Sequence, residues 1–319
     1  MNLGKFYKLI VEEGIKHDPR SKLKVLEYLK SVRQEYNKLP YPEKKAFDKE
    51  KLSNPYSDSR ILFGSLKKEI KTVMIGIDIE TPELLLVDRL REKGKSIDLA
   101  FSHHPQGYAR AEFYRVMNVL YDVLKDVGVS GVKIKKMLDE RINEVARKVI
   151  GGNCTRPVDA ARLLNIPYMC GHTVADNFVY GYFYDLIKKE KPKKVSDMLD
   201  LLYGIPEYKI AMRNNQGPKV ILGKPSNKCG KVLIEMTGGT EGPKNIYKEL
   251  AKNKVTTLLS MHLSEEHFKK AKKHNLNIII AGHISSDTLG INLLLDAVDK
   301  HKELDVIGCS GFTRIRRKK

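Results

Sequence analysis

The fold is decided by residues 71–106, which read KTVMIGIDIETPELLLVDRLREKGKSIDLAFSHHPQ. The continuous apolar run at 72–77 predicts a central strand that is buried on both faces of a sheet. Thr81 and Pro82 predict the start of a helix, with Thr81 as its N-cap. The side chains expected on the inward face of this helix are Leu84, Leu85, Leu86 and Leu90. A second apolar strand follows at 98–102, so the stretch predicts a strand–helix–strand unit of an α/β protein.

A second stretch repeats this order. Residues 231–265 read KVLIEMTGGTEGPKNIYKELAKNKVTTLLSMHLSE, which is again an apolar strand, a helix and an apolar strand. The first copy ends in Ser-His-His at 102–104 and the second in Ser-Met-His at 260–262, and a further strand at 277–281 precedes Gly-His. Ligands bind at the carboxyl ends of strands in open α/β sheets. The repeat therefore predicts a metal or substrate site where two related halves join.

These elements predict an α/β protein with two related α/β lobes, in which central sheets are flanked by helices and the metal site lies between the lobes. We expect a helical N-terminal arm at 1–65, a first α/β lobe at 66–180 and a second lobe at 181–319 that completes the metal site. A helix at 289–300 and a strand at 305–309 are expected to end the fold. A chain of 319 residues suits two domains better than one.

Composition argues against a membrane-spanning or disulfide-bonded protein. Hydrophobic residues make up 41% of the chain and charged residues 30%, as in soluble globular proteins. No apolar run reaches the roughly 20 residues that a membrane-spanning helix needs, and the N-terminus does not resemble a signal peptide. We therefore expect a cytoplasmic protein that does not contact a membrane. The four cysteines are scattered and form no Cys-x-x-Cys pair, which argues against a disulfide framework or a thiolate zinc site.

The formal charge of +19 has two interpretations. It fits a thermophile or a skewed genome composition, and it fits a nucleic-acid surface formed by the N-terminal arm and the basic tail at 314–319. No motif that reads a nucleic-acid sequence accompanies the charge. Nucleic-acid binding is therefore one alternative among the functions that the sequence leaves open.

Three short patterns place imidazole and carboxylate side chains where strands end. They read SHHPQG at 102–107, GHTVAD at 171–176 and GHISSD at 282–287. In the second and third, an aspartate follows the histidine by four residues, a spacing that brings both side chains to one face of a helix. Each pattern alone also fits a structural role, such as a helix cap or histidines that satisfy turn carbonyls. Their joint occurrence at strand ends favours a metal site.

The kind of donor suggests the metal. Imidazoles and carboxylates without thiolates favour zinc, iron or manganese over calcium or magnesium. Five such groups exceed what one catalytic zinc usually takes from a protein, so two divalent metal ions that share a carboxylate are expected.

The same three motifs resemble the dinuclear-metal family of NGG-one-interacting-factor-like proteins, often described as GTP cyclohydrolase type 2-like. The resemblance covers residues 54–315. The residues that match the metal ligands of the family are His103, His104, Asp176, His283 and Asp287. The family usually has Glu at the last of these positions, and the shorter Asp leaves a bridging role open. Residues 56–58, Tyr-Ser-Asp, stand where many members carry Trp-Asp-Asn.

The resemblance also implies a homo-oligomer, commonly a hexamer, and a small-molecule substrate such as a purine nucleotide. His172 is expected to act beside the ligands, where it either holds Asp176 or moves a proton during attack by water. His262 stands where the family more often has an acidic residue, so it either adds a nitrogen ligand or lines the pocket. The loop at 237–242 is expected to be a connecting turn, with phosphate binding as its alternative. Arg110 is expected to be an exposed side chain, with contact to a substrate phosphate as its alternative.

Three functions remain open from the sequence. The first is a metal-dependent hydrolase that resembles GTP cyclohydrolase type 2-like proteins. The second is a non-catalytic metal-binding scaffold for metal storage, delivery or sensing, or a regulatory interaction partner. The third is a basic nucleic-acid-binding protein.

Overall fold

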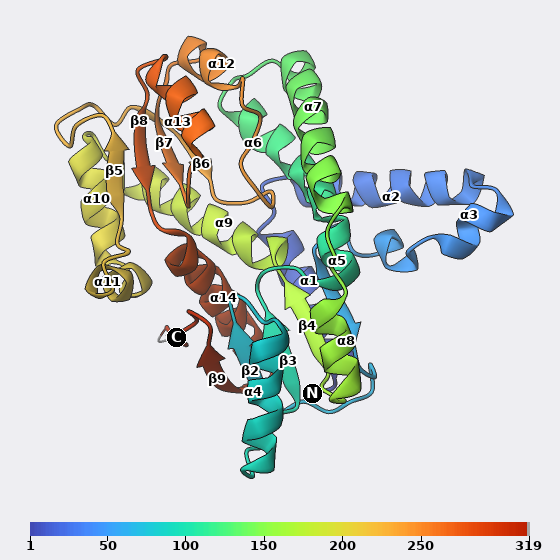
Figure 1. Ribbon diagram of the computed structural model, residues 1–319. Helices are drawn as coiled ribbons and strands as arrows, with labels where there is room; N and C mark the ends of the chain where they lie inside the picture. The colour runs from blue at the N-terminus through green and yellow to red at the C-terminus, as the bar shows by residue number, and fades with distance from the viewer. Residues whose placement is uncertain (318–319) are drawn as a thin grey trace.

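The chain forms two sheets that are flanked by helices, as the computed structural model of residues 1–317 shows (Figure 1). Lys318 and Lys319, the end of the predicted basic tail, lie outside the described residues. The strands of the first sheet are, in order, β1 (Ser59–Phe63), β4 (Tyr168–Gly171), β3 (Leu99–Ser102), β2 (Thr72–Gly76) and β9 (Asp305–Cys309). Those of the second are β5 (Lys219–Leu222), β8 (Asn277–Ile280), β7 (Val255–Ser260) and β6 (Lys231–Glu235). The predicted α/β class with two related lobes is confirmed.

The two sheets are built in the same way. Helix α4 (Thr81–Glu92) connects the parallel strands β2 and β3, and α12 (Tyr247–Lys252) connects the parallel strands β6 and β7. Each sheet also begins with an antiparallel edge strand that carries a bulge, β1 beside β4 and β5 beside β8. These two edge strands were not predicted, because their sequences lack a long apolar run. The internal repeat is therefore larger than the two stretches that revealed it.

Helices α9 (Thr173–Glu190) and α14 (His283–Asp299) pack against each other between the two sheets. Their close approach requires Gly290, because a Cβ atom there would lie 2.7 Å from the carbonyl oxygen of Ala175 and 2.8 Å from the side chain of Val179. Helix α14 begins at His283 rather than at the predicted 289. The leucine stripe that predicted this helix begins at Leu289, whereas the preceding turns are polar although Ser285 to Thr288 are also buried.

Helix α4 differs from its prediction in two details. Its N-cap is Glu80 rather than Thr81, and it also forms a capping box with Glu83. Leu84 is buried, whereas Leu85 and Leu86 are 53% and 44% exposed. Consecutive leucines cannot all face inward, because successive residues of a helix are separated by about 100°.

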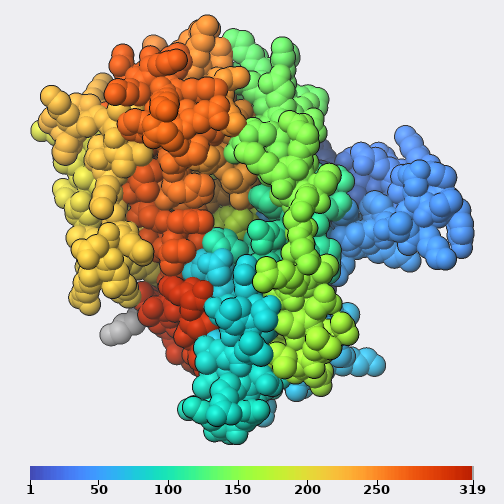
Figure 2. Space-filling view, in the orientation of Figure 1, coloured from blue at the N-terminus to red at the C-terminus, as the bar shows by residue number. Residues whose placement is uncertain are grey.

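The remaining helices cover the sheets and form the N-terminal arm. They are α1 (Leu3–Lys16), α2 (Lys22–Lys38), α3 (Tyr41–Ala46), η1 (Lys49–Leu52), α5 (Gly107–Ala111), η2 (Phe113–Val119), α6 (Leu120–Asp126), α7 (Gly131–Ile150), α8 (Arg156–Leu163), α10 (Val195–Gly204), α11 (Pro206–Arg213) and α13 (Glu265–Lys272). Helix α1 packs on α9 and α14, whereas α2 and α3 project from the body (Figures 1 and 2). None of the helices in residues 1–317 has the length and apolarity to cross a membrane.

The predicted domain limits at 65/66 and 180/181 stay a prediction. The strand pairing adds one fact to them, because β9 lies at the edge of the first sheet beside β2 although it comes near the end of the chain. The segment that follows β8 thus returns to the first sheet and brings α14 across the space between the sheets.

Candidate metal centre

The end of strand β3 positions the paired histidines. The backbone N–H of His103 donates to the carbonyl of Gly76, and that of His104 donates to the carbonyl of Ile77, both at 2.9 Å. The hydroxyl of Ser102 donates to the carbonyl of His104 at 2.8 Å and tightens the turn. The side chain of His103 is fully buried and that of His104 is 22% exposed. Both imidazoles are therefore fixed by the sheet at the edge where ligands bind.

The first turns of α9 and α14 supply the other predicted side chains. His172 is the N-cap residue of α9, and its Nε2 lies 3.7 Å from Asp176 Oδ2. His283 is the first residue of α14, and its Nε2 lies 3.6 Å from Asp287 Oδ2. The predicted pairing of each histidine with the aspartate four residues later is confirmed.

The three segments converge on one cluster. His103 Nε2 lies 3.4 Å from Asp176 Oδ1 and 3.5 Å from Asp287 Oδ1. His104 Nε2 lies 3.4 Å from the other oxygen of Asp287. Two groups of three potential ligand atoms, each within 4.8 Å of one another, share this aspartate; they are His103/Asp176/Asp287 and His104/His283/Asp287. A third such group joins His172 to His103 and His104.

The polar atoms of this cluster fit divalent cations. Five of them are buried and lack a hydrogen-bond partner; they are both ring nitrogens of His103, Oδ1 of Asp176 and both carboxylate oxygens of Asp287. Buried polar atoms in folded proteins are almost always paired, so such a concentration calls for a missing partner. Imidazole nitrogens with carboxylate oxygens are the donor set of zinc, iron and manganese sites.

The carboxylates of the cluster and the burial of the site shift the pKa values of its imidazoles. Burial alone would lower the pKa of His103, but the carboxylates of Asp287 and Asp176 outweigh it and raise this pKa to about 10. The pKa of His104 rises to about 9 because Asp287 and Asp78 likewise outweigh burial. Burial lowers the pKa of His283 to about 4, although Asp287 opposes this effect. Metal binding near neutral pH would therefore displace protons from His103 and His104 but not from His283.

Two further carboxylates hold the imidazoles from outside the cluster. Asp78 Oδ1 lies 2.7 Å from His104 Nδ1, and Asp58 Oδ2 lies 3.0 Å from His172 Nδ1. Asp58 also accepts a hydrogen bond of 2.6 Å from Thr173. Burial would raise the pKa of Asp58, but hydrogen bonds from His172, Thr173 and Ser59 outweigh it and lower the pKa. Carboxylate–histidine pairs of this kind fix the tautomer and orientation of metal ligands.

Neither outer carboxylate was predicted as a functional residue. Asp78 follows the end of β2, at the same sheet edge as the paired histidines. This position after a predicted strand could have identified it as a site residue. Asp58 precedes β1, a strand that was not predicted, so the edge on which it lies was not recognised.

His262 lies at the rim of the centre. Its ring centroid is 4.8 Å from that of His283, and its Nδ1 is 3.7 Å from Glu241 Oε1. It belongs to none of the three groups of potential ligands found in residues 1–317. Burial would raise the pKa of Glu241, but His262, His267 and the Ser264 N–H outweigh it and lower the pKa to about 2.

The two alternative phosphate contacts have unfavourable surroundings. The loop at 237–242 lines a small cavity together with His172 and Asp176, but the same cavity contains the carboxylates of Glu235 and Glu241. An anion there would meet negative charge. Arg110 is half-exposed and lies 4.0 Å from Glu80 Oε1. The structure therefore favours the connecting turn and the exposed arginine over phosphate contacts.

Comparison with known proteins identifies the fold. No family model matches the chain, and no curated protein matches it. A NIF3 superfamily protein from Sphaerobacter thermophilus has a similar structure, with a TM-score of 0.71 and 23% identity over 95% of this chain and 97% of that chain. Reduced HcgD from Methanocaldococcus jannaschii gives a TM-score of 0.43 at 16% identity, over 79% of this chain and 88% of that one. A Bacillus cereus protein related to NIF3 gives 0.37 at 13% identity, over 90% and 95%.

The first of these comparisons covers nearly the whole of both chains. The chain has a NIF3-like fold, and the predicted resemblance is confirmed at the level of the fold.

Proposed function

We propose that the chain is a dinuclear, metal-dependent hydrolase that holds two divalent ions of zinc, iron or manganese. The proposed ligands are His103, His104, Asp176, His283 and Asp287. The observation that carries the proposal is the position of Asp287, whose two oxygens face different imidazoles. Oδ1 lies beside His103, whereas Oδ2 lies beside His104 and His283. A carboxylate placed in this way supports two ions that share it.

The length of the Asp287 side chain does not argue against this role. The sequence left open whether an aspartate reaches far enough to bridge where the family usually has glutamate. In the structure the close packing of α9 on α14 at Gly290 brings the first turns of both helices together. This close approach supports the proposal that the shorter side chain bridges the two ions.

Two bound divalent ions would lower the pKa of a bound water and polarise a carbonyl or phosphoryl oxygen of the substrate. The other residues of the site would orient the metal ligands or transfer protons. Asp78 holds His104 by Nδ1, so that its Nε2 faces Asp287. Asp58 likewise holds His172 by Nδ1. We propose that the free Nε2 of His172 orients Asp176 or carries a proton during attack by water.

The basic tail offers less support for nucleic-acid binding than its charge suggested. Arg314 pairs with Asp296 at 2.6 Å and with Asp299 at 2.9 Å, and Arg317 pairs with Glu207 at 2.8 Å. Guanidinium groups engaged in this way are less available to phosphates. The cytoplasmic location, the hexameric assembly and the nucleotide substrate stay predictions.

The proposal is tested by elemental analysis and turnover of the purified chain. We expect about two divalent ions per chain, and a mass gain of one water when the metal-loaded protein acts on GTP or on an unphosphorylated cyclic amide. His104→Ala should lose metal and turnover, whereas His301→Ala, at an exposed histidine, should keep both. Two ions without turnover on any of these compounds would favour the metal-binding scaffold, and a metal-free wild-type protein would contradict both functions.

A further inference from the structure

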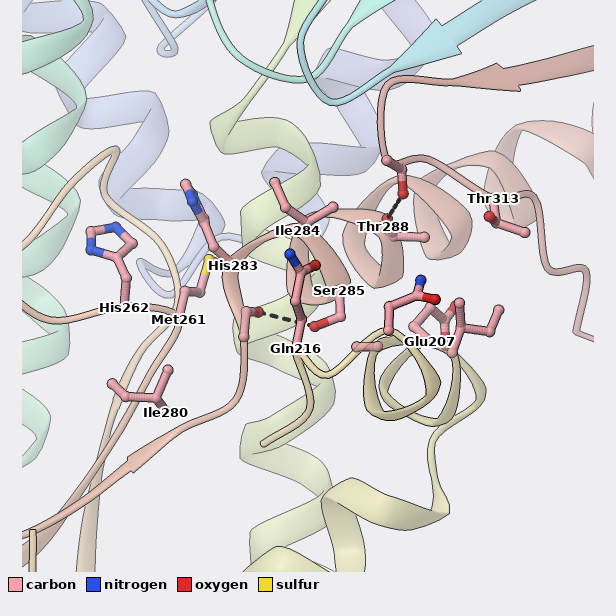
Figure 3. Close-up of a pocket in the computed structure, with 15 residues that line it drawn as sticks. Glu207, Gln216, Met261, His262, Ile280, His283, Ile284, Ser285, Thr288 and Thr313 are labelled. Atoms are coloured by element: carbon pink, nitrogen blue, oxygen red, sulfur yellow. Dashed lines mark hydrogen bonds between the residues drawn. The ribbon is translucent and has the colours of Figure 1, made fainter. Parts of the chain in front are cut away.

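A cavity of about 390 Å³ opens beside the metal centre (Figure 3). It shares Met261, His262 and His283 with the edge of the centre. The residues that line it come from the segment after β7, the end of β8, the first turns of α14, helix α11 with the residues that follow it, and the loop after β9. Its volume lies in the range of about 300–1,000 Å³ that is usual for small-molecule sites. A ligand in this cavity would lie directly against the proposed metal ligand His283.

The wall of the cavity exposes more apolar than polar surface. The apolar side chains that line it belong to Ile210, Ala211, Met261, Ile280 and Ile284. Two hydroxyl groups in the wall are already engaged, since Ser285 donates to Gly282 at 3.2 Å and Thr288 to Gly311 at 3.4 Å. The exposed side-chain amides of Asn214 and Gln216 lie at the rim. An amide offers both donors and an acceptor, so the rim suits a ligand that also offers both.

The charge of the cavity is unusual for this chain. The sequence contains 58 lysines and arginines, yet none of those in residues 1–317 lines the cavity. Its only carboxylate belongs to Glu207, which is held by Arg317 at 2.8 and 2.9 Å and by Asn292 at 3.0 Å. Proteins recognise phosphate groups mainly with arginine and lysine. A triphosphate in this cavity would lose its hydration and meet no arginine or lysine in the wall, so the only compensating cations would be those of the metal centre at its edge.

We propose that this cavity binds an uncharged cyclic amide, whose ring packs on the aliphatic wall and whose amide group bonds to Asn214 and Gln216. The inference rests on the proposed hydrolase function and names its substrate class. In the reaction the oxygen of water bonds to the carbonyl carbon and the ring C–N bond breaks. The protons of the water pass to the released nitrogen and to the new carboxyl group. One water is consumed, and no oxidant or reductant is needed.

Binding is tested by titration calorimetry on the metal-loaded full chain. The uncharged probes are dihydrouracil, hydantoin and guanosine, and GTP is the charged counterpart of guanosine. We expect at least one uncharged probe to bind, and GTP to bind about tenfold more weakly than guanosine or not at all, a difference that calorimetry resolves. Tighter binding of GTP than of guanosine, or no binding of any uncharged probe, would overturn the proposal.

Two variants locate the binding site. Ala211→Phe fills the cavity from α11 and is expected to weaken binding of the uncharged probe about tenfold or more, with metal content unchanged. Gln216→Lys adds a cation at the rim and should shift the preference toward GTP. The matched control is Gln34→Lys, at an exposed residue of α2, which should leave the preference as it is. Unchanged binding in Ala211→Phe, or an equal shift in both lysine variants, would contradict the proposed site.

The outcomes separate this inference from the proposed function. Uncharged probes that bind in the cavity but are never opened would support the binding site and contradict the hydrolase. Turnover of GTP at an intact metal centre, with no effect of Ala211→Phe or Gln216→Lys, would support the hydrolase and overturn the binding site.

Discussion

The two copies of the repeat have the same backbone plan but different side chains at the centre. Register pairs Gly76 with Ser102 in the first copy and Glu235 with Ser260 in the second, so the two strand ends correspond. In each copy the serine hydroxyl donates at 2.8 Å to the carbonyl two residues later. The next residue is the buried His103 in the first copy and Met261 in the second. The shared fold thus provides two equivalent edges, and only one of them carries paired histidines.

The copies also differ in how they hold their imidazoles. In the first copy, Asp78 holds His104 and Asp58 holds His172. In the second, Thr237 stands where Asp78 would, and it donates to Asn177 instead. The residues before β5 are Gln-Gly-Pro at 216–218 and include no carboxylate. The side chain of His283 is accordingly 38% exposed, against 8% for His172. The first copy supplies imidazoles that carboxylates hold in place, whereas the second supplies the more exposed His283, which faces the cavity.

The largest expected effect comes from Asp287, where the two copies meet. Because two of the three candidate ligand groups contain Asp287 and only one contains Asp176, Asp287→Asn should reduce metal content at both proposed positions and Asp176→Asn at one. Elemental analysis of each variant after identical purification measures this difference. Asp139→Asn, on the exposed face of α7, is the control and should keep the wild-type content. Equal metal loss in the Asp287 and Asp176 variants would contradict a shared carboxylate.

Metal removal should loosen the contact between the copies. The ions would join α9 to α14 through Asp176 and Asp287; Oδ1 of Asp176 and both carboxylate oxygens of Asp287 are buried without a hydrogen-bond partner. A ligand at 100 times its dissociation constant stabilises a protein by about 2.7 kcal/mol. We therefore expect a chelator to lower the unfolding temperature of the wild type by several degrees, and zinc or manganese to restore it. The Asp287→Asn variant should show no such difference, and a wild type that is insensitive to the chelator would argue against bound ions.

A smaller effect is expected from the outer carboxylate of the first copy. Asp78→Asn keeps the shape of the side chain but removes the charge that orients His104. Loss of such a partner typically weakens metal affinity about 10–100-fold. Competition with a chromophoric chelator measures the change. Thr237→Val, at the corresponding position of the second copy, should leave the affinity nearly unchanged. Similar losses in the two variants would show that the copies contribute alike.

Local sequence patterns predicted the parts of this site that lie where long apolar strands end. His103, His104 and His283 follow such strands, and a helical spacing links His172 to Asp176. The edge strands β1 and β5 escaped prediction because each carries a charged residue, Arg60 or Lys219, beside a brief apolar run, and Asp58 went unrecognised with them. The contact between α9 and α14, which brings Asp176 and Asp287 into one cluster, depends on packing between distant segments. No local sequence pattern predicts such packing. Gly290 is the one residue at this contact whose type the packing requires, because a Cβ atom there would collide with α9.

The smallest expected effect compares the two serines that tighten the strand ends. The hydroxyl of Ser102 donates to the carbonyl of His104 and accepts from the buried N–H of Ile79 at 3.2 Å. That of Ser260 donates to His262 at 2.8 Å and has only a longer contact of 3.5 Å to Glu235. A hydrogen bond contributes about 1 kcal/mol, and a buried donor left unpaired costs about 1–3 kcal/mol. Ser102→Ala should therefore lower the free energy of unfolding by about 2 kcal/mol and Ser260→Ala by about 1 kcal/mol.

Urea denaturation in the presence of a chelator measures these losses without a contribution from metal. Metal titration of the same variants provides a second readout, because Ser102 positions a proposed ligand and Ser260 positions His262, which lies outside the candidate ligand groups. Ser102→Ala should weaken metal binding, whereas Ser260→Ala should not. If Ser260→Ala weakens metal binding as much as Ser102→Ala does, then His262 is also a ligand. The second copy would then contribute two imidazoles, those of His262 and His283.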